Sequence, residues 1–267
     1  MHLGKKVTAR RLSRMKGRRR IVMVTAYDYP TARLVDEAGV DAILVGDSLG
    51  MVVLGMSSTL QVTLDDMIRH TSAVARARPQ ALVVADMPFG SYEPSPRVAV
   101  ESAIALARAG AEAVKLEGGE EYADRVRSIV QAGIPVMGHI GLTPQRHLRI
   151  GGYKLRGKTP REEEQLLRDA QALEEAGAFA LVIEFTRSEV ARRITEKLSI
   201  PTICIGSGPH CDGQVLVIHD LLGLTPQPPP FAKRYADLSR TIVEAVRRYA
   251  EEVRTGEFPG PEHTPLP

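Results

Sequence analysis

Short apolar runs alternate with longer amphipathic segments along most of the chain. A continuously apolar run of four or five residues is typical of a strand that is buried on both faces of a parallel sheet. The runs predict eight strands, at Ile21–Thr25, Ala42–Val45, Leu82–Ala85, Ala113–Leu116, Ile134–Gly138, Ala180–Ile183, Thr202–Ile205 and Gln214–Ile218.

The segments between these runs carry helix signals, such as Pro at the start of a helix and Gly after its end. Helices are expected at Pro30–Ala38, Thr63–Arg76, Ser95–Ala109, Glu120–Ala132, Pro160–Ala176, Val190–Leu198 and Leu238–Arg254. Alternating strands and helices imply right-handed parallel crossovers. Eight such strands in 267 residues fit a closed (β/α)8 TIM barrel. A doubly wound sheet is the alternative, but it should have a glycine-rich first turn, which Thr25–Tyr29 is not.

The predicted organisation is a single barrel with two flanking segments. We expect a basic N-terminal helical segment over residues 1–20, the (β/α)8 catalytic domain over 21–255, and an irregular C-terminal tail over 256–267. The hydrophobic content of 43% and the charged content of 25% are ordinary for a globular protein.

Four of the predicted strands deliver an acid at or just beyond their carboxyl ends, namely Asp47, Asp86, Glu117 and Glu184. One such acid is most often a loop residue or a helix cap. Four of them are more informative, because the carboxyl ends of all barrel strands meet at one face, where barrel active sites lie.

Clustered carboxylates call for a cation, since two unit charges 4 Å apart repel by about 4 kcal/mol at an effective dielectric constant of 20. Asp47, Asp86 and Glu117 come from consecutive strands and can converge on one ion, for which oxygen ligands favour Mg²⁺. Glu184 would face that ion across the barrel mouth and could serve as a base. Lys115 projects to the same side as Glu117, which suggests that it binds a substrate carboxylate or enolate oxygen.

The remaining candidates have plainer interpretations. His139 by itself is more often a buried histidine whose hydrogen bonds are satisfied. Cys204 and Cys211 are expected to be reduced thiols of a cytoplasmic protein, because no paired cysteine framework is present; a Cys204–Cys211 bridge or metal pair is the less favoured alternative. No run is long enough for a membrane span, and no hydrophobic signal segment precedes Ile21.

The net charge of +3 hides an asymmetry. Nine of the 35 Lys and Arg side chains lie in residues 1–20, which hold no acid, so residues 21–267 carry 26 basic and 32 acidic side chains. Such an arm could bind nucleic acid or target the chain to an organelle. The favoured interpretation is a solvated helix with a partial apolar stripe formed by Val7, Leu12 and Met15.

Seven segments together resemble the ketopantoate hydroxymethyltransferase (3-methyl-2-oxobutanoate hydroxymethyltransferase) family, from about Lys5 to His263. They are TAYDYP at Thr25–Pro30, VGDSLGMVVLG at Val45–Gly55, ADMPFGSY at Ala85–Tyr92, VKLEGG at Val114–Gly119, GHIGLTPQ at Gly138–Gln145, GGYKLRG at Gly151–Gly157 and DGQVLVIHD at Asp212–Asp220. Any one of these would be weak evidence, but seven in order are highly specific.

The resemblance implies a (β/α)8 barrel enzyme of pantothenate and coenzyme A biosynthesis. Such an enzyme transfers a hydroxymethyl group from 5,10-methylenetetrahydrofolate to 3-methyl-2-oxobutanoate through an enolate that Mg²⁺ stabilises. It also implies a cytoplasmic homodecamer with small-molecule substrates and one Mg²⁺ per subunit, and no binding to nucleic acid or membranes. The positions that match the family's sites are Asp47, Asp86 and Glu117 for the metal, Asp47, Ser48, Asp86 and Lys115 for the oxo acid, Glu184 for the proton acceptor and His139 for an accessory residue near the reacting centre.

The chain departs from the family pattern at Ser207, where Ala is usual, at Cys204, where Gly is frequent, and after His263. These departures concern the folate side and the tail. The nearest rival is a Mg²⁺-dependent carbon–carbon lyase or mutase of the isocitrate lyase and phosphoenolpyruvate mutase kind, although the catalytic cysteine loop of the lyases is absent. A rival of another class is an inactive barrel whose basic arm binds nucleic acid or a partner.

Overall fold

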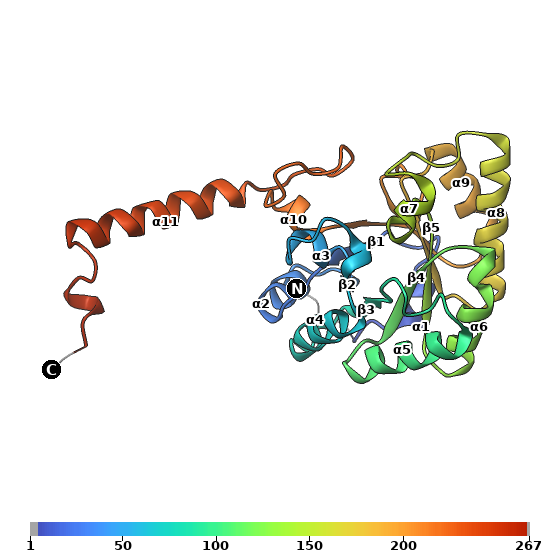
Figure 1. Ribbon diagram of the computed structural model, residues 1–267, viewed down its shortest axis with the longest axis horizontal. Coiled ribbons are helices and arrows are strands. Elements are labelled where there is room, and N and C mark those ends of the chain that lie inside the picture. The colour runs from blue at the N-terminus through green and yellow to red at the C-terminus, as the bar shows by residue number, and fades with distance from the viewer. Residues whose placement is uncertain (1–4, 266–267) are drawn as a thin grey trace. The chain divides into compact units, whose positions relative to one another are not determined.

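Eight parallel strands close into a barrel and follow one another around it in sequence order. The computed structural model describes residues 5–265, so the ends of the predicted 1–20 and 256–267 segments lie outside the described residues (Figure 1). The predicted TIM barrel is confirmed. Its strands are β1 (Ile21–Thr25), β2 (Ala42–Val45), β3 (Leu82–Asp86), β4 (Ala113–Glu117), β5 (Val136–Gly141), β6 (Ala180–Glu184), β7 (Thr202–Ile205) and β8 (Gly213–Leu216).

Helices cover the outside of the barrel (Figure 1). The helices of the barrel unit are α1 (Ala9–Ser13), α2 (Tyr29–Glu37), α3 (Leu49–Val52), α4 (Leu64–Arg76), α5 (Pro96–Arg108), α6 (Ala123–Gln131), α7 (His147–Ile150), α8 (Pro160–Glu175) and α9 (Ser188–Lys197), with 3₁₀ turns at η1 (Thr59–Gln61), η2 (Glu120–Tyr122) and η3 (Pro144–Arg146). Five of those in residues 5–217 begin at a residue whose side chain caps the helix, namely α1, α2, α4, α5 and α8. The Thr63 side chain accepts a hydrogen bond from the backbone N–H of Asp66, and the Asp66 carboxylate accepts one from Thr63 in return.

The barrel interior changes character along the strands. Its amino-terminal half is an apolar cluster that includes Met23, Leu82 and Ile203. Side chains alternate along a strand, so Lys115 and Glu117 of β4 lie on the same side of the strand as this apolar cluster but nearer to the carboxyl end. The polar side chains are therefore confined to the carboxyl end of the barrel.

The N-terminal segment closes the amino-terminal end of the barrel. Val7, Leu12 and Met15 are at most 8% exposed and belong to the apolar cluster of the barrel interior, which confirms the predicted apolar stripe. The basic side chains pair with acids of the barrel, as Lys6 does with Glu112 (2.6 Å) and as others do at Asp41 and Asp212. These pairs favour the structural role of the arm over nucleic-acid binding.

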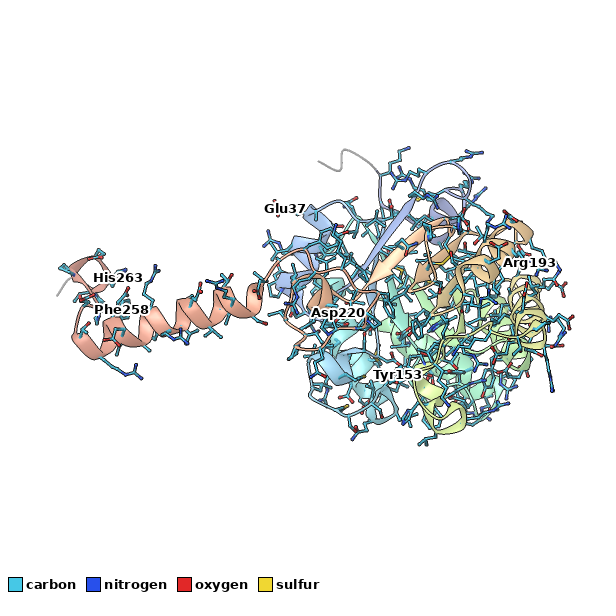
Figure 2. The ribbon with its side chains drawn as sticks, turned by 90° about the horizontal axis from the view of Figure 1, so that it is seen from above. Glu37, Tyr153, Arg193, Asp220, Phe258 and His263 are labelled. Carbon is cyan, nitrogen blue, oxygen red and sulfur yellow. A yellow bond between two sulfur atoms is a disulfide. The ribbon has the colours of Figure 1, made fainter. Side chains whose placement is uncertain are left out.

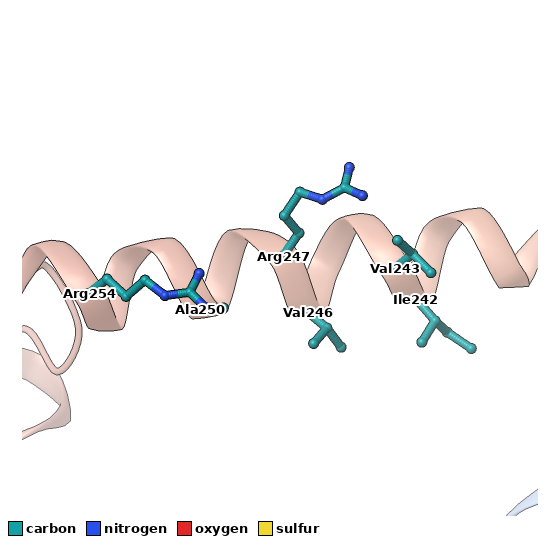
Figure 3. A pocket seen from close by; sticks show the side chains of 6 residues that line it. All are labelled: Ile242, Val243, Val246, Arg247, Ala250 and Arg254. Atoms are coloured by element: carbon teal, nitrogen blue, oxygen red, sulfur yellow. The ribbon is translucent and has the colours of Figure 1, made fainter.

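A second compact unit comprises residues 218–265 of the described chain. It contains α10 (Ile218–Leu221), α11 (Leu238–Thr255) and the 3₁₀ turn η4 (Pro261–His263). The apolar side chains of α11, including Ile242 and Val246, are about half exposed (Figure 3). Phe258 packs against His263, with ring centroids 5.2 Å apart (Figure 2). The assignment of α11 to the barrel domain stays a prediction.

The two cysteines form a disulfide, so the prediction of reduced thiols is wrong. Cys204 lies within β7 and Cys211 lies two residues before β8. The short connection brings their Cα atoms to 5.7 Å, within the usual range for a disulfide. No helix within residues 5–265 has the length and hydropathy that a membrane span requires.

The packing of the N-terminal segment can be tested through stability. Leu12→Ala should lower the free energy of unfolding by about 2–5 kcal/mol, because it leaves a cavity in a fully buried position. Leu34→Ala is the matched control: Leu34 is 68% exposed, and its loss should change stability by no more than about 0.5 kcal/mol. Equal denaturation midpoints for the two variants would show that the segment does not stabilise the barrel.

Candidate active site

The strand register brings the predicted site residues to one end of the barrel. Asp86 on β3 pairs with Lys115 on β4, and Glu117 pairs with His139 on β5. Glu184 ends β6 beside Gly141. Lys115, Glu117 and His139 are at most 4% exposed, whereas the side chain of Glu184 is 17% exposed. Glu184 is therefore the most accessible of the acids at the barrel mouth.

Asp47 and Asp86 are held together by the backbone. The N–H of Asp47 donates to Oδ2 of Asp86 at 3.0 Å, while Oδ1 of Asp86 pairs with the Lys115 ammonium at 2.7 Å. A Cβ at position 46 would lie 2.8 Å from Oγ of Ser48, so glycine there leaves room for the Ser48 side chain beside the strand end. The hydroxyl of Ser48 in turn hydrogen-bonds the buried Tyr27 hydroxyl at 2.8 Å.

His139 links the β4 residues to Glu184. Its Nδ1 lies 3.2 Å from Nζ of Lys115 and 3.5 Å from Oε1 of Glu117, and its Nε2 lies 3.1 Å from Oε2 of Glu184. The structure thus brings together Asp86, Lys115, Glu117, His139 and Glu184 in one continuous network of contacts.

Gln145 is a site residue that spacing alone did not indicate. It is 1% exposed, and the turn η3 places it in the barrel mouth. Its Nε2 donates to Oδ2 of Asp47 (2.8 Å) and its backbone N–H donates to Oε2 of Glu117 (3.1 Å). The Tyr92 hydroxyl lies 2.7 Å from Oε1 of Gln145. Both residues lie in the segments that carry the family resemblance, which was the only signal for them.

The pKa values of the acids in this cluster are set by their burial and by the neighbouring charges. Burial, together with the charges of Asp86 and Glu117, raises the pKa of Asp47 well above its usual value. Burial alone would also raise the pKa of Glu117, but hydrogen bonding and charge from His139 and the charge of Lys115 hold it below its usual value.

The two cations of the cluster are both stabilised by carboxylates. Burial opposes the charge of Lys115, but Asp86 and Glu117 outweigh it and raise the pKa of the ammonium. Burial and the charge of Lys115 oppose protonation of His139, whereas its hydrogen bonds to Glu117 and Glu184 raise its pKa to about 9. Near neutral pH the imidazole is therefore protonated.

The donor set fits a divalent cation in chemistry and charge. Four carboxylates against the lysine and the protonated histidine leave two negative charges, and burial together with the charges of Asp86 and Glu117 raises the pKa of Asp47. Asp47 and Asp86 offer the hard oxygen ligands that Mg²⁺ prefers. Within residues 5–265, however, no three Asp, Glu, His or Cys side chains are arranged to hold a metal together. Glu117 is turned toward His139 and Gln145, and its role as a metal ligand stays a prediction.

Comparison with known proteins gives one consistent family. The family model of ketopantoate hydroxymethyltransferase matches residues 6–261. The chain is 68% identical over 260 residues to the 3-methyl-2-oxobutanoate hydroxymethyltransferase of Aeropyrum pernix, covering 97% of this chain and 95% of that one. It is 69% identical over 256 residues to the enzyme of the same name from Hyperthermus butylicus, covering 96% and 89% of the two chains.

Solved structures with the same fold are more distant in sequence. A phosphonopyruvate hydrolase in complex with oxalate and Mg²⁺ superposes with a TM-score of 0.63 at 16% identity, covering 97% of this chain and 93% of that chain. A 2,3-dimethylmalate lyase of the phosphoenolpyruvate mutase/isocitrate lyase superfamily gives 0.60 at 21% identity, covering 96% and 92%. At these identities the likeness shows the fold alone.

Removing the polar end of Gln145 should destabilise the site. Gln145→Met keeps a similar side-chain length but removes the donor to Oδ2 of Asp47, a loss that costs about 1–3 kcal/mol, whereas the Tyr92 hydroxyl keeps its hydrogen bond to the carbonyl of Glu117. We expect the free energy of unfolding, measured by chemical denaturation, to fall by about 1–3 kcal/mol. Gln131→Met, at an exposed position that ends α6, should be nearly neutral. If both substitutions leave the free energy of unfolding unchanged, Gln145 does not support Asp47.

Proposed function

The chain belongs to the ketopantoate hydroxymethyltransferase family, and we propose that it transfers a hydroxymethyl group from 5,10-methylenetetrahydrofolate to 3-methyl-2-oxobutanoate. The product is 2-dehydropantoate (ketopantoate), an intermediate of pantothenate and coenzyme A biosynthesis. The observation that carries the proposal is the pairing of Asp86 with Lys115 at one side of the barrel mouth and of Glu184 with His139 at the other.

The substrate oxo acid presents one carboxylate and one oxo oxygen. We assign Lys115 and Ser48 to bind these oxygens, and Asp47 and Asp86, with Glu117 as a further candidate, to hold Mg²⁺. When bound there, Mg²⁺ would supply a Lewis acid that polarises the 2-oxo group and so acidifies the proton on C3. The charge of Lys115, fixed by its 2.7 Å contact with Asp86, would favour the negative charge that develops on the same oxygens.

Glu184 is the residue we assign to take the C3 proton. Its side chain is the most exposed of the four acids, and only its Oε2 is engaged by His139. The protonated imidazole would keep the carboxylate oriented, so His139 is an accessory residue in this assignment. The closed strand order puts β6 opposite β2, so Glu184 would approach the oxo acid from the side away from Asp47.

Deprotonated C3 can then form a bond to the methylene carbon of the folate. Overall, one water molecule is consumed and supplies the oxygen of the new hydroxyl group, and tetrahydrofolate leaves. We also propose a homo-oligomer, a decamer by family resemblance, and a cytoplasmic location; both stay predictions. The basic arm is assigned no nucleic-acid partner, because its cations pair with acids of the barrel.

Metal removal tests the cation. Chelator-treated enzyme should form no ketopantoate from the oxo acid and methylenetetrahydrofolate, and added Mg²⁺ should restore turnover. Asp86→Asn should need far more Mg²⁺ or fail to respond, whereas Asp65→Ala, at an exposed position on α4, should behave as wild type. Wild-type turnover in the metal-free enzyme would rule out the Mg²⁺ assignment.

Hydrogen exchange in D2O tests the base separately from carbon transfer. With Mg²⁺ and 3-methyl-2-oxobutanoate but no folate, the wild-type enzyme should exchange the C3 proton, followed by NMR. Glu184→Gln should bind the oxo acid with little change in affinity but exchange roughly 10²–10⁴-fold more slowly. The control Glu175→Gln, on the exposed side of α8, should exchange at the wild-type rate. If Glu184→Gln also exchanges at that rate, Glu184 is not the base.

A further inference from the structure

A cavity that is rich in arginine lies beside the barrel mouth. Its volume is about 480 Å³, in the range of small-molecule sites. Arg146, Arg149, Arg156 and Arg161 all line it. We refer to this cavity as the arginine pocket. None of these four residues has a role in the catalytic assignment given above.

The acids of the arginine pocket are already engaged, but most of its arginines are not. Glu121 pairs with Arg146, and Asp169 accepts hydrogen bonds from the backbone N–H of Glu120 (3.1 Å) and from Nε2 of Gln165 (2.9 Å). The Oε2 atom of Glu162 accepts from the backbone N–H of Lys158 at 2.8 Å.

Within residues 5–265, three of the four arginines are in no ion pair, and the four arginines outnumber the three acids that line the pocket, Glu121, Glu162 and Asp169. Arg149, Arg156 and Arg161 form no ion pair with any acid in the described part of the chain, and Nε of Arg156 is buried without a hydrogen-bond partner. Arg161 lies in the first turn of the 16-residue helix α8, where the helix dipole also favours an anion. The arginine pocket therefore has the charge to bind an anionic group.

The arginine pocket adjoins the active site through the chain itself. Gly118 and Gly119, which directly follow Glu117, line it, as does Gly141, which pairs with Glu184 in the strand register. The backbone of Arg156 is fixed beside the same strand end, because its N–H donates to the carbonyl of Phe185 at 2.9 Å.

The segment 149–156 spans both sites. It carries Arg149 and Arg156 in the arginine pocket and Tyr153 between them (Figure 2). Partial burial, followed by the negative charges of Glu184 and Asp47, raises the pKa of Tyr153, so its hydroxyl lies within the field of the catalytic acids. A ligand that extends from the barrel mouth along this segment would reach the arginines.

We propose that the arginine pocket binds the carboxylates of the glutamyl tail of the folate co-substrate, which rests on the proposed function. The reacting methylene group and the glutamyl carboxylates stand at different parts of the folate, separated by the aminobenzoyl group. Arginine matches a carboxylate with two parallel hydrogen bonds, so three arginines suit a group that carries two carboxylates or more. Inorganic phosphate shares the negative charge, and the test includes it as a competitor.

The test compares binding of tetrahydrofolate and of tetrahydropteroate, which lacks the glutamate, by calorimetry with the intact enzyme. Wild type should bind tetrahydrofolate at least about tenfold more tightly, as one charge-assisted contact of about 1.4 kcal/mol would give. The double variant Arg149→Gln/Arg161→Gln should bind both compounds alike. Arg127→Gln removes the same charge from an exposed position on α6 outside the arginine pocket and should keep the tenfold preference.

The outcomes separate this proposal from the proposed function. If wild type binds both compounds equally well, or if the double variant keeps the preference, the arginine pocket does not bind the glutamyl tail. Displacement of inorganic phosphate by tetrahydropteroate as effectively as by tetrahydrofolate would also overturn the assignment. If neither compound binds to wild type although the C3 proton of the oxo acid still exchanges, the folate part of the proposed function is wrong. Retained preference in Arg127→Gln, with loss in the double variant, supports the proposal.

Discussion

The site depends on the mutual repulsion of carboxylates that the barrel forces together. Asp47, Asp86, Glu117 and Glu184 converge because parallel strands end at one face. Lys115 and a protonated His139 compensate only part of their charge, and burial together with the charges of Asp86 and Glu117 raises the pKa of Asp47. A divalent cation that binds here would relieve this repulsion, so the same interaction that is unfavourable for folding provides the affinity for the metal.

The network around these acids fixes which charges remain available. Gln145 donates hydrogen bonds to the carboxylates of both Asp47 and Glu117. It therefore connects segments that follow different strands. Lys115 is bound to Asp86 and lies 3.2 Å from Nδ1 of His139, and its ammonium has three N–H groups, which is compatible with the proposed contact to a substrate oxygen. Glu184 differs from the other acids in that its side chain is partly exposed, which is what a group that exchanges protons with a substrate requires.

Periodicity predicted the barrel because each strand is a local apolar run, and the acids could be placed because they directly follow these runs. Long-range contacts were beyond this reasoning. Gln145 is 98 residues from Asp47 in sequence, and it reaches the site through the turn η3, in a stretch for which no helix or strand was predicted. The Cys204–Cys211 disulfide was missed because it depends on the approach of β7 to β8 rather than on the number of cysteines. Strand ends shifted where the pattern was weak: β8 begins at Gly213 and ends at Leu216.

The amino-terminal end of the barrel contributes stability, whereas the carboxyl end carries the acids of the site. Replacing a buried charged cluster by apolar side chains often stabilises a protein, so the acids at the carboxyl end are a cost to folding. The amino-terminal half offsets that cost, because its interior is apolar and the N-terminal segment closes it with Val7, Leu12 and Met15. The ion pairs of this segment lie outside the apolar cluster. They attach the segment to the loops that precede β4 and β8. The tightly packed amino-terminal end of the barrel thus permits the carboxyl end to keep the uncompensated charge of its acids.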